Sequence, residues 1–459
     1  MNEKSINGIY IAFSLIITIV VVLWDMYLDK NVSIGILSTV LIAFGVSFTA
    51  LIQKKEDVKN GIYLFLLFYA IYLIYSSSVH YGLINFYDVV NIVPDEEHYF
   101  YPSAIEATKK IDQGFTLFDF SDLLIYSDTA AMIYFMGIVG SFAEVYGENS
   151  VLLQKVSLIF VAALIPVVMY GISRLYFSKT ISLNVAIVYG LFSFVPFLST
   201  IILRDMHIAL MFILTIYIVL SRLTIVNFIL LLIVTFISYY LRPQTGIFMM
   251  GFVSVYFFIF IQSTIKNKYM QFFTYMSFLL ITLVAVLNSP LMDMFNQISE
   301  SSAGRSEMQA SSSSMGAKMA KLPLGLNVVA LFGFSQIQPF PPSLIFKGEN
   351  RGIFELWHLL AGVSWFFGWG FLIYGLKVKK IFASLDLKVK LMFLFAMLYL
   401  ILIATIEFNQ RRQMAVYPIV YLLMVFSYLS MSISERTKMW FGMGIFYIIL
   451  VVLLNYLKL

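Results

Sequence analysis

The 459-residue chain is too apolar for a soluble protein: 61% of its residues are hydrophobic, 12% are charged, and the mean hydropathy is +0.89. Soluble proteins carry roughly twice that charged fraction. Cysteine is absent, which excludes disulfides, thiolate metal sites and thiol catalysis, and no basic tract suited to nucleic acid is present. Apolar runs near 20 residues recur throughout and predict an all-α, polytopic transmembrane protein with a single domain over residues 1–459.

Thirteen hydrophobic runs predict membrane spans. They cover residues 8–24, 34–53, 61–79, 152–173, 181–199, 202–221, 223–241, 246–264, 270–289, 357–376, 389–406, 414–432 and 439–457. The N-terminal segment leads straight into the first run and lacks a small-residue cleavage site, which indicates a signal anchor. A further segment, 128–147, is apolar but contains Gly137, Gly140 and Glu144.

The basic residues determine the topology that we expect. If 128–147 does not cross, one side carries 16 basic and 5 acidic residues, a balance of +11, and the other carries 14 basic and 20 acidic residues, a balance of −6. Because basic residues favour the cytoplasmic side, we expect 128–147 to be an interfacial helix that lies on the membrane or dips into it. The N-terminus is then cytoplasmic in an inner or plasma membrane, and two large loops, 80–151 and 290–356, are external.

The first external loop contains an acidic segment, Pro94-Asp95-Glu96-Glu97-His98-Tyr99-Phe100-Tyr101. Ionisable groups at a membrane edge are functional candidates, although a solvated acidic turn is the simpler reading. A carboxylate can take the proton from an attacking hydroxyl, so Asp95 and Glu96 are the catalytic candidates. Tyr99 is a candidate for binding a sugar ring, and Glu97 and His98 are further site candidates.

Several arginines fall on the same face in this topology. Arginine binds phosphate through a planar, permanently charged fork, which predicts a substrate-phosphate site. Its candidate residues are Arg204, Asp205, Arg242, Arg411 and Arg412, with Arg351 and His358 as further candidates. A local ion pair at Arg204-Asp205, and snorkelling of Arg411-Arg412 to lipid headgroups, are the structural alternatives.

The segment Asp95-Glu96-Glu97-His98-Tyr99, followed by Ala104, resembles the Asp-Glu-x-x-Tyr of the first external loop in GT-C fold, polyprenyl-phosphate-dependent membrane glycosyltransferases. These include the protein mannosyltransferase and aminoarabinose transferase relatives. The likeness continues through 128–147, Arg204-Asp205, and Arg412 with Pro418, and covers about residues 60–245 and 405–432.

The resemblance implies a GT-C-like fold, Asp95 as catalytic base, a polyprenyl-linked sugar donor, and a glycan or lipid acceptor. No cofactor is certain in this family. Some members use a divalent cation, which implies that Mg²⁺ or Mn²⁺ could bind at Asp95, Glu96 and Glu97. The expected product belongs to the cell surface, so the active site is expected on the external (periplasmic) face.

Two alternatives stay open. A surface-polysaccharide polymerase of the O-antigen or capsule type shares the paired arginines and the long second loop. A lipid-linked oligosaccharide flippase or other transporter is the third possibility, although transporters commonly show an internal repeat, which this sequence lacks. The chain departs from better-known GT-C members in having no C-terminal soluble domain and in its Ser/Met-rich stretch from Ser299 to Ala320, which leaves the acceptor open.

Overall fold

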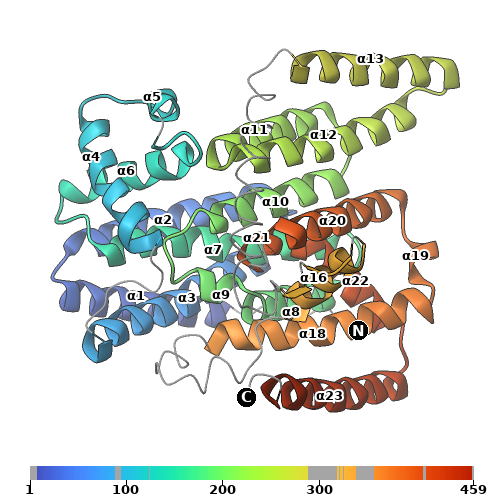
Figure 1. Cartoon of the computed structure of the whole chain (residues 1–459). Coiled ribbons are helices and arrows are strands. Elements are labelled where there is room, and N and C mark those ends of the chain that lie inside the picture. The colour runs from blue at the N-terminus through green and yellow to red at the C-terminus, as the bar shows by residue number, and fades with distance from the viewer. Residues whose placement is uncertain are drawn as a thin grey trace.

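The computed structural model describes residues 8–87, 95–123, 125–287, 318–319, 321–323, 325–337, 356–406 and 410–456. Within these ranges every regular element is a helix (Figure 1). The all-α prediction is therefore confirmed for the described part of the chain. Most of the second predicted external loop, including Arg351, lies outside the described residues.

Long helices run beside one another and form the body of the molecule. They are α1 (Gly8–Asp29), α2 (Val32–Ile52), α3 (Val58–Tyr87), α7 (Val151–Arg174), α8 (Lys179–Phe192), α10 (Asp205–Leu220), α11 (Ile225–Leu241), α12 (Pro243–Thr264), α13 (Lys268–Leu287), α18 (Leu356–Lys377), α20 (Leu387–Ile406), α22 (Tyr417–Leu429) and α23 (Ile433–Tyr456). A helix thus lies over each of the thirteen predicted hydrophobic runs.

Shorter helices connect them. These are α4 (Tyr101–Asp112), α5 (Leu117–Asp122), α6 (Ala130–Glu144), α9 (Val195–Leu198), α16 (Leu326–Ile337), α19 (Ile381–Ser384) and α21 (Gln410–Gln413), with a π-helical turn η1 (Glu96–Phe100) and a 3₁₀ turn η2 (Met414–Val416).

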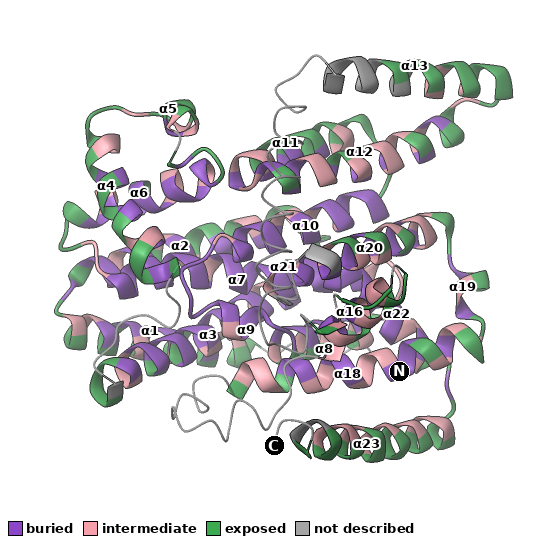
Figure 2. Ribbon diagram, in the orientation of Figure 1, coloured by how far each residue is buried: buried purple, intermediate pink, exposed green. Residues whose placement is uncertain are grey.

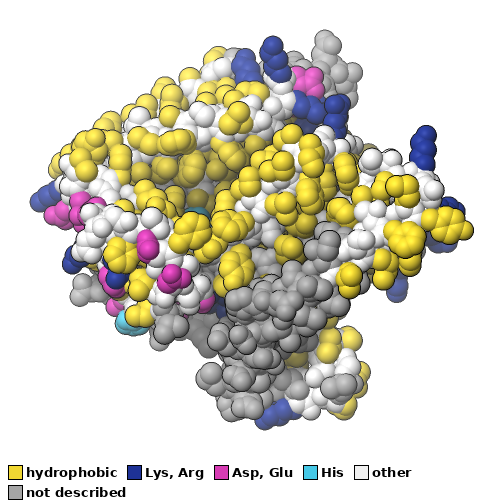
Figure 3. All heavy atoms as spheres, turned by 90° about the horizontal axis from the view of Figure 1, so that it is seen from above, with side chains coloured by type: hydrophobic (Ala, Val, Ile, Leu, Met, Phe, Trp, Pro, Cys, Tyr) yellow, Lys and Arg dark blue, Asp and Glu magenta, His cyan; other side chains and the backbone are white. Residues whose placement is uncertain are grey.

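Among the described residues, nine helices are long and apolar enough to cross a membrane: α1, α2, α3, α7, α12, α18, α20, α22 with the turn before it, and α23. Helices α6, α8, α10, α11 and α16 are apolar but shorter. Figure 3 shows a broad hydrophobic surface with charged side chains gathered toward its margins. The multi-pass transmembrane character predicted from the sequence is therefore confirmed.

Helix α7 is the centre of the bundle. It packs against α2, α3, α8 and α10. In its most hydrophobic stretch of 18 residues, 94% of the residues are buried (Figure 2). The side chain of Ser150 begins the helix by accepting a hydrogen bond from the Leu153 amide at 3.3 Å, which satisfies one of the unpaired donors of the first turn. A helix surrounded by protein can carry a polar residue that a lipid-facing helix could not, and α7 carries Lys155.

Two ends of the bundle can be distinguished. We call the end that carries residues 95–150, Arg204, Arg242 and 410–413 the site end. The opposite end carries the turns around 53–57, 174–179, 221–224, 378–386 and 430–432. Ion pairs there join helices far apart in sequence, at 3.0 Å between Arg174 and Asp57 and at 2.8 Å between Lys379 and Glu435.

Helix α6, in the segment predicted to be interfacial, begins and ends at the site end. Asp128, just before it, accepts a hydrogen bond from Arg204, and the carbonyl of Glu148, just after it, accepts one from Asn31 at 2.7 Å. The helix packs along α4 (Figure 1). A Cβ at Gly140 would lie 2.0 Å from the Thr108 hydroxyl, so this close approach requires glycine.

Some helix ends differ from the hydrophobic runs. The predicted span 181–199 ends as a helix at Phe192, because Ser193 is extended and a separate helix, α9, begins at Val195 with Pro196 in its first turn. Helix α3 continues to Tyr87 instead of ending near 79. Hydrophobicity alone does not register these local breaks and extensions.

Candidate functional site

The acidic segment folds as one tight turn that continues into α4. Asp95 stands at the N-terminal cap of the π-helical turn η1. Successive residues of a helical turn point in different directions, roughly 100° apart in an α-helix. Asp95, Glu97 and His98 are consequently exposed, whereas Glu96 is fully buried.

Glu96 forms a buried ion pair with Lys155. Its Oε1 atom lies 3.4 Å from Lys155 Nζ, and both side chains have zero exposure. The same oxygen accepts a hydrogen bond from the Ile202 amide at 3.2 Å. Removing two charges from water is costly, and mutual attraction with added hydrogen bonds offsets that cost. Glu96 therefore connects the acidic segment to α7 and to the non-helical stretch before α10.

Asp95 lies against the arginine pair. Its Oδ2 atom accepts a hydrogen bond from Arg411 at 3.2 Å, although the two residues are 316 positions apart in the sequence. The Asp95 side chain is 55% exposed and that of Arg411 is 22% exposed. The predicted base and one predicted phosphate ligand are thus in direct contact, at a place open to solvent.

Arg204 is held at the start of α10. It donates to the backbone oxygen of Asp128 at 2.7 Å and to the Asp128 carboxylate at 3.1 Å. Tyr99 is close by: its hydroxyl donates to the Ile125 carbonyl at 2.7 Å. Burial raises the pKa of the Tyr99 phenol; the nearby Asp128 carboxylate also raises it, and Arg204 opposes this.

Arg242 joins the cluster because the chain turns there. The residue before a proline is disfavoured in the helical region, and Arg242 is extended between the end of α11 and Pro243, the first residue of α12. Burial lowers the pKa of the Arg242 guanidinium, the positive charges of Arg204 and Arg412 lower it further, and Asp205 opposes them. Since an arginine stays protonated, this place favours binding of an anion.

Asp205 and Tyr399 complete the group. Asp205 lies in the first turn of α10 and is 6% exposed, and within the described chain its carboxylate makes no ion pair. Tyr399, on α20, donates its hydroxyl hydrogen to the Arg412 carbonyl at 3.1 Å. The positive charges of Arg204 and Arg412 and the buried Asp205 carboxylate thus all act on the Arg242 guanidinium.

The remaining predicted residues fall elsewhere. His358, near the start of α18, stacks on Phe197 with ring centroids 4.5 Å apart. The three neighbouring carboxylates do not converge, because Glu96 is directed to Lys155 and Asp95 to Arg411. Over the described ranges, no group of three or more metal-ligating residues is present, and the divalent-cation site stays a prediction.

Sequence reasoning missed three residues of this region: Lys155, Asp128 and Tyr399. Lys155 had a usable signal, because it is the one charged residue in the apolar run 152–173, and a charge within a predicted span commonly has a partner in the bundle. Asp128 and Tyr399 had no such signal, since neither their spacing nor their neighbours set them apart.

Comparisons of the chain with protein-family models, with curated proteins and with solved structures each gave no match. The site is therefore interpreted from its own geometry.

Proposed function

We propose that this protein is a membrane-embedded glycosyltransferase, GT-C-like, that takes a sugar from a polyprenyl-(di)phosphate donor at the site end of the bundle. The observation that carries the proposal is the contact between Asp95 and Arg411. Arg412 follows Arg411 in the chain, and its charge, like that of Arg204, acts on Arg242. A candidate base and candidate phosphate ligands meet there from distant parts of the chain.

The chemistry follows from these positions. The acceptor hydroxyl attacks the anomeric carbon, its oxygen forms the new glycosidic bond, and Asp95 takes the proton. The bond between the anomeric carbon and the phosphate oxygen breaks, and the electron pair leaves with the lipid phosphate. Fixed arginine charges stabilise that leaving group. Donor phosphate that displaces the Asp95 carboxylate from Arg411 frees Asp95 to accept the proton.

A repeat-unit polymerase is the second candidate, and one contact favours it. Helix α16, from the region of the second predicted external loop, reaches the arginine pair: the Gln336 amide donates to Gln413 Oε1 at 2.8 Å, next to Arg412. A polymerase must hold two lipid-linked substrates at once, and a second loop beside the phosphate ligands suits that task. A lipid-linked acceptor, as opposed to a protein or free sugar, would distinguish this candidate.

The proposal includes a topology of thirteen spans with a cytoplasmic N-terminus and an external site end. The cysteine-free chain allows a direct test. Single cysteines at Ser121 and Ser312 should both react with an impermeant thiol reagent in intact cells, and a cysteine at Ser384, at the opposite end, should not. Labelling of Ser121 or Ser312 alone would show that the segment 128–147 crosses the membrane.

Replacing Arg412 with lysine or Arg204 with alanine should reduce transfer. Lysine keeps the charge but loses the planar fork, and a hydrogen bond to a charged group contributes about 1.5–3 kcal/mol, which is about 10- to 100-fold in rate. Product formation from a radiolabelled lipid-linked donor measures this.

Arg222→Lys is the matched control for the arginine variants. Arg222 is exposed at the opposite end of the bundle, so its replacement should leave transfer unchanged. Normal turnover in both Arg412→Lys and Arg204→Ala would remove the arginines from the mechanism.

A further inference from the structure

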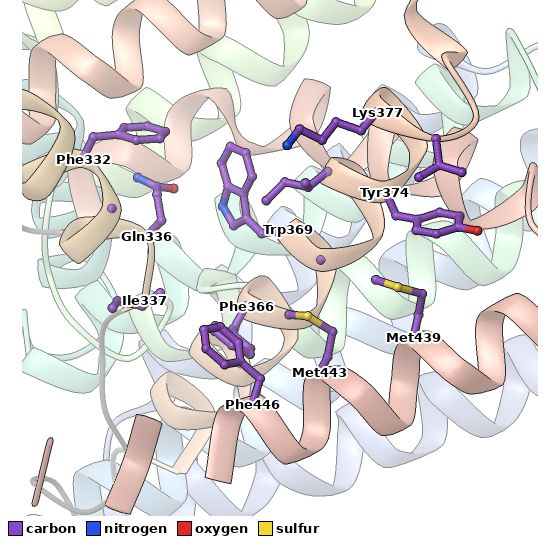
Figure 4. Close-up of a pocket in the computed structure, with 14 residues that line it drawn as sticks. Phe332, Gln336, Ile337, Phe366, Trp369, Tyr374, Lys377, Met439, Met443 and Phe446 are labelled. Atoms are coloured by element: carbon purple, nitrogen blue, oxygen red, sulfur yellow. The ribbon is translucent and has the colours of Figure 1, made fainter. Parts of the chain in front are cut away.

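An apolar groove lies between three helices that belong to the second half of the chain. It encloses about 550 Å³ and is walled by α16, α18 and α23. Phe332 and Gln336 from α16, Phe366 and Trp369 from α18, and Met443 and Phe446 from α23 face the same space (Figure 4). Its size is within the range of pockets that hold small ligands, and its walls are almost wholly hydrophobic.

Two of the three walls of the groove belong to helices that we expect to cross the membrane. Both α18 and α23 are long and apolar enough to cross a bilayer. In α23, no residue of the most hydrophobic 18-residue stretch is buried by the rest of the protein. The medium around such a helix is hydrocarbon, so the molecules that reach the groove from the side are lipid chains. Met439 and Met443 line it, and methionine adapts its shape to irregular apolar partners.

One end of the groove reaches helix α21, which carries Arg411 and Arg412. Gln336 lines that end, accepts a hydrogen bond from Trp365 at 3.0 Å and donates to Gln413, the neighbour of Arg412. The Nε2 atom of Gln413 is buried and has no acceptor within the described chain. Tyr374 and Lys377 line the other end. The groove therefore runs along α18 from the phosphate-binding candidates toward the opposite side of the membrane.

We propose that this groove binds the isoprenoid chain of the lipid-linked donor, with the lipid phosphate at the Arg412 end. The inference rests on the proposed function and adds to it the place of the lipid tail. Continuity between an apolar channel and a cationic cluster matches a molecule with an anionic head and a long hydrocarbon chain. A polyprenyl chain is longer than the groove, so its distal part lies in the bilayer.

Gly333→Phe tests the groove directly. Gly333 lines it, and a Cβ built there meets no atom within 4 Å, so the ring enters open space and occupies the volume meant for the lipid. A polyprenyl phosphate with a diazirine in its tail, in phosphatidylethanolamine vesicles, should label peptides of α16, α18 and α23 in the unaltered protein. Gly333→Phe should lower that labelling about tenfold, equal to about 1.4 kcal/mol.

Gly442→Leu is the control, because Gly442 is on α23, is exposed and does not line the groove. It should label as the unaltered protein does. Unlabelled polyprenyl phosphate should compete, whereas geranyl phosphate, which has the same head but a short tail, should compete poorly. Equal competition by phosphatidylglycerol would overturn the inference in favour of an ordinary phospholipid, and a groove closed by a second copy of the chain would overturn it as well.

Two outcomes distinguish a failure of the groove from a failure of the proposed function. Groove labelling that Gly333→Phe removes, in a protein that transfers no sugar, supports the groove and overturns the glycosyltransferase. Sugar transfer with a KM for the long-chain donor unaltered by Gly333→Phe, and with labelling unaltered, supports the enzyme and overturns the groove.

Discussion

Replacing Asp95 with asparagine should lower the rate of glycosyl transfer by about 10²- to 10⁴-fold, the usual contribution of a general base. Asparagine keeps the shape of the side chain and can still accept the hydrogen bond from Arg411, so the contact at 3.2 Å can survive. It cannot take a proton from the acceptor hydroxyl. The loss should therefore appear in kcat, with little change in KM for the donor, because donor phosphate binds the arginines.

The neighbouring carboxylates supply the controls. Glu97, two residues after Asp95, is exposed, and the Glu97→Gln variant should transfer sugar at close to the normal rate. Glu96→Gln acts on a buried ion pair, so its defect should accompany a loss of stability. A nearly normal Asp95→Asn beside an inactive Glu97→Gln would move the base to Glu97, and full activity in all three variants would make the acidic segment a solvated loop.

Replacing Lys155 with methionine should destabilise the folded protein by about 3–5 kcal/mol, the usual cost of removing one partner of a buried ion pair. Glu96 would lose its cationic partner in a place with zero exposure, although the Ile202 amide would still donate to it at 3.2 Å. The expected result is a clear fall in the midpoint of thermal unfolding of the detergent-solubilised protein. Loss of the link between η1 and α7 should also move Asp95 away from Arg411.

The double variant Lys155→Met with Glu96→Gln separates charge from packing. Removing both charges of a buried pair is often neutral, so the double variant should recover most of the stability that Lys155→Met loses. Lys109→Met, at an exposed position of α4, should change stability by less than about 0.5 kcal/mol. If Lys155→Met is as stable as Lys109→Met, the buried pair does not hold the acidic segment in place.

The buried pair also changes the interpretation of the acidic segment. The sequence analysis names Asp95 and Glu96 as catalytic candidates and Glu97 as a further candidate. In the fold, Asp95 is in contact with Arg411, Glu96 is in contact with Lys155, and Glu97 is exposed. Adjacent residues of a helical turn project about 100° apart, so neighbours in sequence seldom serve one site together. Asp95 is for this reason the best-placed of the three for proton transfer.

The positions of the helices could be predicted from the sequence, because the information for them is local. A hydrophobic run near 20 residues predicts a span wherever it occurs, and α7 and α18 follow their runs to within two residues. The break at Arg242-Pro243 is also local, since proline disfavours a helical conformation in the residue before it. The balance of basic and acidic residues also predicts that both ends of 128–147 lie on one side of the membrane. In the fold, α6 begins and ends at one end of the bundle.

The contacts between charged side chains could not be predicted from the sequence. Nothing near Asp95 indicates Arg411, 316 residues away, and nothing near Glu96 indicates Lys155. The partner of a charged side chain depends on how whole helices pack and rotate about their axes. That arrangement follows from the summed packing of many apolar side chains around α7, each with a small and non-directional contribution. No short segment carries it, so only the fold shows that Asp95 meets Arg411 and that a groove lies between α16, α18 and α23.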